Sequence, residues 1–259
     1  MTAQQTAITL KAGLSASEVQ KLGEAFAPLP AQEVLAWALG RFGDRVSLAS
    51  SFGAEDMVLT DMLVKLSPKA RIFTLDTLRL NKETLELLDE TRDRYKVNLE
   101  VFYPETKAAN DMVAKHSLNL MYESVDNRKL CCGIRKVEPL NRALKDLVAW
   151  TTGLRREQAP TRAAVAKVEA DEAHPGLIKL NPLADWTNDQ VWDYIRANKV
   201  PYNKLHDKGY PSIGCDPCTR AIKPGEHPRA GRWWWEQDLG LKECGLHVAG
   251  APAGAHAKA

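Results

Sequence analysis

The chain has 259 residues, 44% of them hydrophobic, which is enough for one large α/β domain and excludes disorder of the whole chain. Its 35 basic and 33 acidic residues give a net charge of +2, which argues against a protein whose main partner is nucleic acid. We expect a cytoplasmic protein, because no basic segment precedes an apolar run at the N-terminus and no segment is apolar enough to span a membrane.

Two helices are expected near the N-terminus. Residues 15–18 read as a capping box, and Pro30 suits the start of the second helix. The last residues are rich in Ala, Gly and Pro, which predicts a disordered tail. The expected organisation is N-terminal helices at 1–43, an α/β domain at 44–222, a mobile C-terminal segment at 223–248 and the tail at 249–259.

Four short β-like runs alternate with apolar-periodic stretches typical of helices. Strands separated by helices of this length indicate right-handed βαβ units, and so a mostly parallel, twisted sheet with helices on both faces. Beyond Gly153 the strand pattern weakens, and the next expected element is a helix capped by residues 185–189. The predicted strands are 45–50, 71–75, 98–102 and 147–152, and the predicted helices lie near 57–66, 82–95 and 108–116.

Ligands of such sheets bind at the carboxyl ends of the strands. Residues 50–56 follow the first strand as a small-residue turn that enters a helix, where free N–H groups and the helix dipole favour phosphate or sulfate. Taken alone, this turn reads more readily as an ordinary β–α turn with a serine cap, and it matches neither common phosphate-loop pattern. Residues 75–79 and 153–156 reach the same edge. The candidate ligand contacts here are Ser50, Ser51, Gly53 and Gly153.

The five cysteines fall in three groups: Cys131 beside Cys132, Cys215 and Cys218 in a C-x-x-C pair, and Cys244 alone. Four thiolates suit tetrahedral zinc or an iron–sulfur cluster, and spacing leaves the two open. A disulfide between the adjacent cysteines is disfavoured by strain and by the expected compartment. Cys244, with a histidine three residues on, has the setting of a nucleophile.

The segments around these cysteines, together with residues 201–206 and 231–236, closely resemble the assimilatory sulfonucleotide reductases. The closest resemblance is to the iron–sulfur branch, the thioredoxin-dependent adenylyl-sulfate (APS) reductases, and it runs from about Arg45 to His247. The resemblance implies a fold like that of the adenine-nucleotide α-hydrolases, a homo-oligomer, and a [4Fe-4S] cluster on four cysteines. These are Cys131, Cys132, Cys215 and Cys218, carried in segments 131–140 and 209–220.

The resemblance also implies substrate contacts, residue by residue. Lys136 would lie near both cluster and substrate, and Arg229, Arg232 and His247 would bind the phosphosulfate. Arg162 corresponds to an arginine of the loop after the fourth strand, although this loop is one residue shorter than the usual pattern. Adenosine contacts would come from a motif that reads L-D-T-G-R-L in many relatives, in which Leu78 replaces the glycine here. These contacts are Leu75, Asp76 and Thr77.

The implied chemistry is a thiol-dependent reduction. The Cys244 thiolate would attack the sulfur of APS and expel AMP, leaving a cysteine S-sulfonate. A thiol of thioredoxin would then attack the Cys244 sulfur and release sulfite, so the thiols supply both electrons. The cluster would serve structure and the electrostatics around Lys136.

Three other functions compete with this reading. A reductase of the 3′-phosphorylated nucleotide PAPS, or a dual-specificity enzyme, is the first, although cluster-free PAPS reductases lack both cysteine pairs. An ATP-pyrophosphatase-type enzyme usually shows S-G-G-x-D-S after the first strand, and residues 51–56 have only one of the two glycines and lack the final serine. An iron–sulfur sensor that binds nucleic acid is disfavoured by the neutral charge and the absence of a DNA-binding motif.

Overall fold

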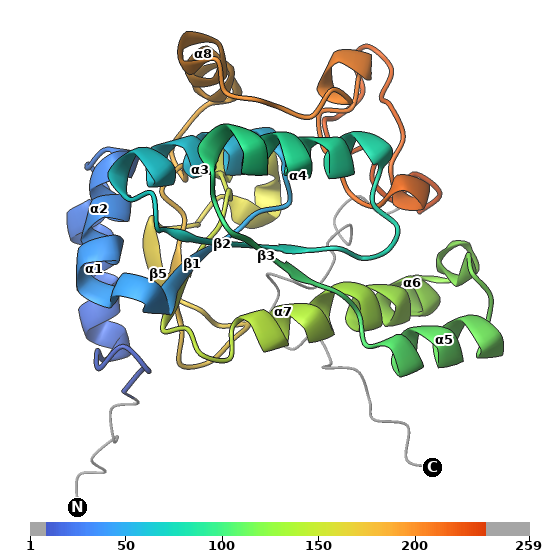
Figure 1. The fold of residues 1–259 in the computed structure, drawn as a ribbon, viewed down its shortest axis with the longest axis horizontal. Helices are drawn as coiled ribbons and strands as arrows, with labels where there is room; N and C mark the ends of the chain where they lie inside the picture. The colour runs from blue at the N-terminus through green and yellow to red at the C-terminus, as the bar shows by residue number, and fades with distance from the viewer. Residues whose placement is uncertain (1–8, 237–259) are drawn as a thin grey trace, which may run out of the picture.

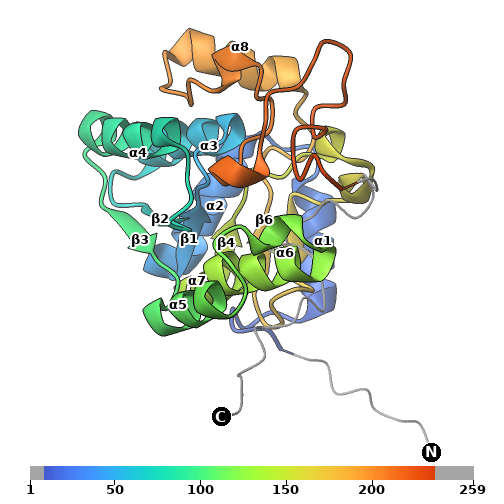
Figure 2. The same cartoon turned by 90° about the vertical axis from the view of Figure 1, so that its right-hand side faces the viewer.

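Six strands form one sheet in the order β3-β2-β1-β4-β6-β5 in the computed structural model, which describes residues 9–236 (Figures 1 and 2). All neighbours pair in parallel except β5, which runs antiparallel to β6. The strand order reverses between β1 and β4, and ligands of open α/β sheets bind at such a switch point. The strands are β1 (Val46–Ala49), β2 (Arg71–Leu75), β3 (Leu99–Phe102), β4 (Ala149–Thr151), β5 (Val168–Ala170) and β6 (Ile178–Leu180).

Helices cover both faces of the sheet, as predicted. Helices α3, α4 and α8 lie on one face and α5, α6 and α7 on the other, while α1 packs on β5 and α2 on α3 and β1 (Figures 1 and 2). None of the helices in the described part of the chain is long and apolar enough to cross a membrane. The helices are α1 (Ala16–Phe26), α2 (Ala31–Phe42), α3 (Ala54–Leu66), α4 (Lys82–Tyr95), α5 (Thr106–Lys115), α6 (Val125–Cys132), α7 (Glu138–Ala143) and α8 (Asn188–Asn198).

Local sequence explains where several helices begin. The Ser15 Oγ accepts the Glu18 backbone N–H at 3.3 Å, and the Glu18 carboxylate accepts the Ser15 N–H at 2.7 Å. Thr187 and Gln190 make the same reciprocal pair at the start of α8. The capping box predicted at residues 15–18 is therefore confirmed. The helix predicted at 82–95 is also confirmed, as α4.

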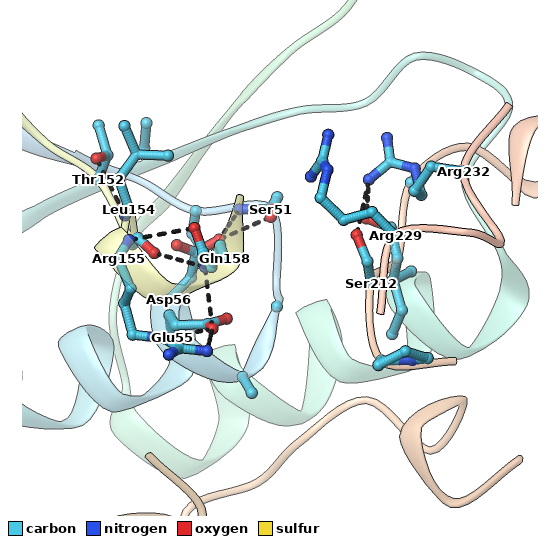
Figure 3. Close-up of a pocket in the computed structure, with 18 of the residues that line it drawn as sticks. Ser51, Glu55, Asp56, Thr152, Leu154, Arg155, Gln158, Ser212, Arg229 and Arg232 are labelled. Atoms are coloured by element: carbon cyan, nitrogen blue, oxygen red, sulfur yellow. Dashed lines mark hydrogen bonds and ion pairs between the residues drawn. The ribbon is translucent and has the colours of Figure 1, made fainter. Parts of the chain in front are cut away.

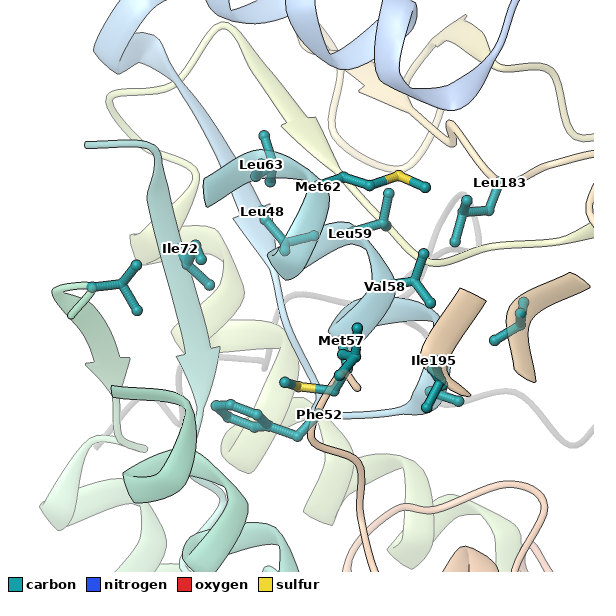
Figure 4. Close-up of a cluster of buried hydrophobic side chains, with 14 of the residues drawn as sticks. Leu48, Phe52, Met57, Val58, Leu59, Met62, Leu63, Ile72, Leu183 and Ile195 are labelled. Atoms are coloured by element: carbon teal, nitrogen blue, oxygen red, sulfur yellow. The ribbon is translucent and has the colours of Figure 1, made fainter. Parts of the chain in front are cut away.

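The main core lies between the sheet and helices α3, α4 and α8 (Figure 4). Leu48 and Ile72 from the strands meet Met57, Met62 and Ile195 from the helices, and each of these side chains is no more than 2% exposed. Burying a side chain of this size stabilises the fold by roughly 1.5–3 kcal/mol. This packing holds the N-terminus of α3 against the end of β1.

Strands β5 and β6 were not predicted. Each is three residues long, and the buried Lys179 interrupts the apolar pattern of β6. Their pairing comes from neighbours: Ala149 to Thr151 of β4 pair with the whole of β6. The connection between α6 and α7 was also missed. It is a π-helical turn, Gly133–Val137, a kind of irregularity frequent at functional sites.

Candidate active site and cysteine cavity

One cavity of about 810 Å³ opens at the carboxyl ends of β1, β2 and β4, where the strand order reverses. Asp76 does not line it, because its carboxylate accepts the Leu78 N–H at 2.8 Å and shapes the turn after β2. Leu78 itself has φ +58°, in the left-handed region that favours glycine, which is the residue in the family motif. The predicted contacts that line the cavity are Ser50, Ser51, Gly53, Leu75, Thr77, Lys136, Gly153, Arg162, Arg229 and Arg232.

The loop between β1 and α3 is closed by a carboxylate rather than by a serine cap. The Ser51 backbone N–H and Oγ both donate to Asp56 Oδ2 at 2.7 Å (Figure 3). The N-cap residue, Gly53, makes no side-chain capping bond. Buried Phe52 takes φ +59°, held by the Ser50 Oγ, which accepts the Phe52 N–H at 3.2 Å. The loop therefore presents an acid to the cavity beside the uncapped helix N-terminus.

Asp56 is a cavity residue that the sequence analysis missed. Its burial raises the pKa to about 6, against the opposing effect of the two Ser51 hydrogen bonds. Gly153 faces it so closely that a Cβ there would lie 2.5 Å from Asp56 Oδ1. The sequence indicated a role for Asp56 in the cavity only through its position in the segment after the first strand.

Asp56→Asn is expected to stabilise the ligand-free protein at pH 7.5. The folded pKa of about 6 lies above the ordinary 3.8, so the folded state binds this proton more tightly than the unfolded state. Ionisation therefore lowers the free energy of unfolding as the pH rises from about 4 to about 6, by roughly 3 kcal/mol at most. Chemical denaturation between pH 4.5 and 8 measures the effect. The advantage should be largest above pH 7 and shrink toward pH 4.5, whereas a pH-independent difference like that of exposed Asp89→Asn would contradict it.

The loop after β4 supplies a second set of polar groups. Arg155 donates to Glu55 Oε1 at 2.9 Å and pairs with Glu157 at 2.9 Å, which neutralises the acidic start of α3 (Figure 3). Gln158 Nε2 donates to the same Glu55 oxygen at 3.0 Å and to the Gly153 carbonyl at 3.1 Å. Arg162 donates to the Gln158 side-chain oxygen. Arg155 was not predicted, and it organises the loop that carries Arg162.

The far end of the cavity is basic. Lys136 comes from the π-helical turn, and Arg229 and Arg232 come from the loop after the C-x-x-C pair. Arg232 is 7% exposed, and its Nη1 donates to Ser212 Oγ at 3.2 Å and to the Ile213 carbonyl at 3.3 Å (Figure 3). It pairs with no carboxylate of residues 9–236. A buried guanidinium without a counter-ion favours an anionic ligand.

The two cysteine pairs surround a smaller cavity beside this basic end. Cys131 and Cys132 end α6, while Cys215 and Cys218 flank a single 3₁₀ turn. All four are buried and carry free thiols, so the structure has no disulfide between the adjacent pair. Burial raises the pKa of the Cys218 thiol to about 12, and it raises that of Cys131 as well. Without a metal the thiols of Cys131 and Cys218 would be neutral at pH 7.

Cations and unused donors line the cysteine cavity. Two buried nitrogens there, Arg135 Nε and Trp233 Nε1, have no hydrogen-bond partner among residues 9–236, and the same is true of Arg232 Nε. Within the described residues no three His, Cys, Asp or Glu side chains converge as one metal ion requires. Thr77 Oγ1 lies 3.2 Å from Cys215 Sγ, which joins this cavity to the turn after β2. The cations that line it are Arg79, Arg128, Arg135, Lys136 and Arg232.

Two predicted site residues, Cys244 and His247, lie outside the described residues. The expected disordered tail and residues 237–248 of the expected mobile segment lie outside them too. The position of the predicted nucleophile relative to the cavity therefore stays a prediction. What the structure describes is the chain up to Glu236, which forms a buried ion pair with Arg128 at 2.7 Å.

Comparison with known sequences gives evidence that does not depend on the structure. The sequence profile of the phosphoadenosine phosphosulfate reductase domain matches residues 45–221. An enzyme named adenosine 5′-phosphosulfate reductase from Burkholderia cepacia is 56% identical over 210 residues, with 81% of this chain and 83% of the relative covered. A protein of the same name from Allochromatium vinosum is 53% identical, with 79% of each covered.

Solved structures agree on the fold. A phosphoadenylyl-sulfate reductase from Candida auris, in complex with phosphate, superposes with a TM-score of 0.68 at 33% identity, covering 78% of this chain and 96% of that one. A Candida glabrata FMN adenylyltransferase, at 15% identity and a TM-score of 0.52, covers 85% of this chain and 81% of its own, and shares the fold alone. The predicted fold class is thus confirmed, and the chain belongs to the phosphoadenosine phosphosulfate reductase domain family, alongside proteins named adenosine 5′-phosphosulfate reductase.

Proposed function

We propose that this chain reduces adenylyl sulfate to sulfite and AMP during sulfate assimilation. The observation that carries the proposal is one continuous cavity with two unlike ends. Its sheet-edge end offers the loops around Ser51 and Gly153, and its basic end offers Lys136, Arg229 and Arg232. A nucleotide joined to a sulfate matches this arrangement, and relatives at 53–56% identity carry the corresponding name.

The acidic loop favours APS over its 3′-phosphorylated form. Asp56 is buried at the sheet-edge end, and with a pKa of about 6 it is mainly ionised at neutral pH. A second phosphate dianion at that end would be repelled, whereas ribose hydroxyls can donate to the carboxylate.

A [4Fe-4S] cluster on Cys131, Cys132, Cys215 and Cys218 fits the cysteine cavity. Four buried thiols surround it, and the cations around them can balance the negative charge of thiolates and sulfides. The partnerless donors Arg135 Nε and Trp233 Nε1 suit sulfur acceptors. When bound, the cluster would fix the ends of these loops and set the electrostatic potential around Lys136.

The chain's own residues would carry out the chemistry. The basic end would hold the sulfate oxygens and stabilise the charge that develops on them. The Cys244 thiolate would attack the sulfur, forming an S–S bond as the S–O bond to AMP breaks, and AMP leaves as the anion. A fully extended chain spans about 3.5 Å per residue, so the segment after Glu236 is long enough to bring Cys244 over Arg232.

A thioredoxin-like dithiol would complete the cycle. One of its thiolates would attack the Cys244 sulfur and release sulfite, and its second thiol would free Cys244 as the partner becomes a disulfide. The two electrons that reduce the sulfur thus come from the dithiol. Free thiols at all four described cysteines fit the cytoplasm proposed from the sequence. The homo-oligomer implied by the resemblance stays a prediction.

Steady-state assays test this function. Cluster-loaded protein with reduced thioredoxin should release sulfite and AMP in equal amounts from APS. With ATP in place of APS, it should release no pyrophosphate. Pyrophosphate from ATP without sulfite from APS would instead support the ATP-pyrophosphatase alternative.

The cluster gives a separate prediction. Anaerobically purified protein should be brown and hold about four irons per chain, because four thiolates would bind one cubane. Cys218→Ser should lose the iron, while the same substitution at the fifth cysteine, Cys244→Ser, should keep it. Metal analysis and absorption spectra measure both. Stoichiometric zinc in active protein would contradict the cluster, and full iron in Cys218→Ser would remove that residue from the ligands.

A further inference from the structure

Trp233 is a fully buried indole that contacts two guanidinium groups at once. The guanidinium carbons of Arg128 and Arg232 each lie 4.7 Å from its ring centroid. Trp233 is 1% exposed and lines both the nucleotide cavity and the cysteine cavity. Its φ of +42° is costly for a residue with a large side chain, and such strain persists only where surrounding contacts impose it.

The two arginines differ in how their charge is balanced. Arg128 makes a two-point ion pair with Glu236, at 2.7 Å and 3.2 Å, and both groups are buried. Arg232 has no carboxylate partner among residues 9–236, and its Nε is buried without a hydrogen bond. The geometry of Arg232 therefore depends on neutral contacts.

Gly214 is the second neutral contact. A Cβ at this position would lie 2.5 Å from Arg232 Nη2 and 2.7 Å from its Cζ. The Gly214 backbone is outside the left-handed region, so glycine is not required there for conformation. It leaves room for the guanidinium, which is fixed between the Gly214 backbone, the hydrogen bonds to residues 212 and 213, and the Trp233 ring.

An aromatic ring holds a cation in a way that a carboxylate cannot. Its electron-rich face attracts the guanidinium but carries no net charge, so the cation is oriented without being neutralised. A carboxylate at the same place would compete with the anion that Arg232 is meant to bind. The ring also connects Arg232 to Arg128, which lies on the helix that ends in Cys131 and Cys132.

We propose that Trp233, together with Gly214, is a positioning residue that sets the Arg232 guanidinium for the sulfate end of the substrate. The inference rests on the proposed function, which makes Arg232 a sulfate contact. It goes further by assigning the orientation of Arg232 to an indole and a glycine. Arg128 links that orientation to the cysteine-bearing helix α6.

A double-mutant cycle between Trp233→Leu and Arg232→Ala tests the proposal, using cluster-loaded protein with Cys244→Ser to prevent turnover. Equilibrium binding of APS and of AMP is measured for each variant. Trp233→Leu should weaken APS binding by roughly tenfold and AMP binding by less than about twofold. In the Arg232→Ala background it should have no further effect. Trp233→Phe should restore most of the APS affinity, and Gly214→Ala should weaken APS binding in the same selective way.

Several outcomes overturn the inference. Equal losses for APS and AMP would show a general structural effect, and additive losses in the cycle would show that Trp233 does not act through Arg232. Loss of iron in both Trp233 variants would mean that the indole supports the cluster instead. If the Cys244→Ser parent does not bind APS and the protein with Cys244 restored does not reduce it, the proposed function itself fails. An additive cycle in a protein that does reduce APS once Cys244 is restored would contradict only the positioning role of Trp233.

Discussion

Replacing Cys244 with serine is expected to abolish sulfite formation, by at least about 10⁴-fold, because a hydroxyl group cannot form the S-sulfonate or be resolved by a thiol. Iron content and APS affinity should stay within about twofold of the parent. The four described cysteines are poor substitutes for this nucleophile, since they are buried and burial raises the pKa of Cys131 and Cys218. Sulfite release with reduced thioredoxin is the measurement.

The matching result in the unsubstituted protein is a covalent adduct. Incubation with APS and no reductant should add one sulfonate to the peptide that carries Cys244 and release one AMP per chain. Peptide mass spectrometry locates the modification. A sulfonate on another cysteine, or sulfite release that survives Cys244→Ser, would remove Cys244 from its proposed role.

Arg232→Ala is expected to weaken APS binding by roughly 10- to 100-fold, the range for losing charged hydrogen bonds to an anion. Binding of AMP should change much less, because AMP lacks the sulfate. Arg229→Ala should act in the same direction. Exposed Arg196 on α8, which pairs with Asp193, provides a matched control, and Arg196→Ala should change neither affinity.

Equilibrium binding with cluster-loaded protein measures these affinities. Equal losses of APS and AMP affinity in both cavity variants would mean that these arginines do not contact the sulfate. The assignment of the two cavity ends would then be reversed or wrong.

Much of the sheet could be read from the sequence because strands β1 to β4 are apolar runs between periodic helices. The edge strands could not, since β6 is three residues long and contains the buried Lys179. That lysine lies near Glu169 and over the Trp150 ring, contacts that only the folded chain brings together. Pairing with β4, rather than local pattern, defines this strand.

Some residues of the candidate site could be predicted from the sequence and others could not. The family resemblance predicted basic substrate contacts, and four of them, Lys136, Arg162, Arg229 and Arg232, line one cavity in the structure. Asp56 was missed because its role depends on the loop folding back so that Ser51 donates to it twice, and on Gly153 leaving space opposite. The role of Trp233 could not be predicted, because its contact with Arg128 joins residues more than a hundred positions apart.

The spacing of the cysteines could not decide between zinc and an iron–sulfur cluster. The structure adds three facts that the sequence does not contain. The thiols surround a shared cavity, several cationic side chains line it, and buried N–H donors there have no hydrogen-bond partner among the described residues. These features support the cluster that the resemblance implied. Iron analysis tests it independently of substrate.

A competition assay tests the central claim most directly. Cluster-loaded protein and reduced thioredoxin are given APS and PAPS together at equal, limiting concentrations, and AMP, 3′-phospho-AMP and sulfite are quantified as the reaction proceeds. The ratio of 3′-phospho-AMP to AMP formed reports the relative kcat/KM for PAPS and APS. We expect AMP and sulfite to form in equal amounts while 3′-phospho-AMP stays below about a tenth of AMP. Preferential formation of 3′-phospho-AMP, or AMP released without sulfite, would contradict it.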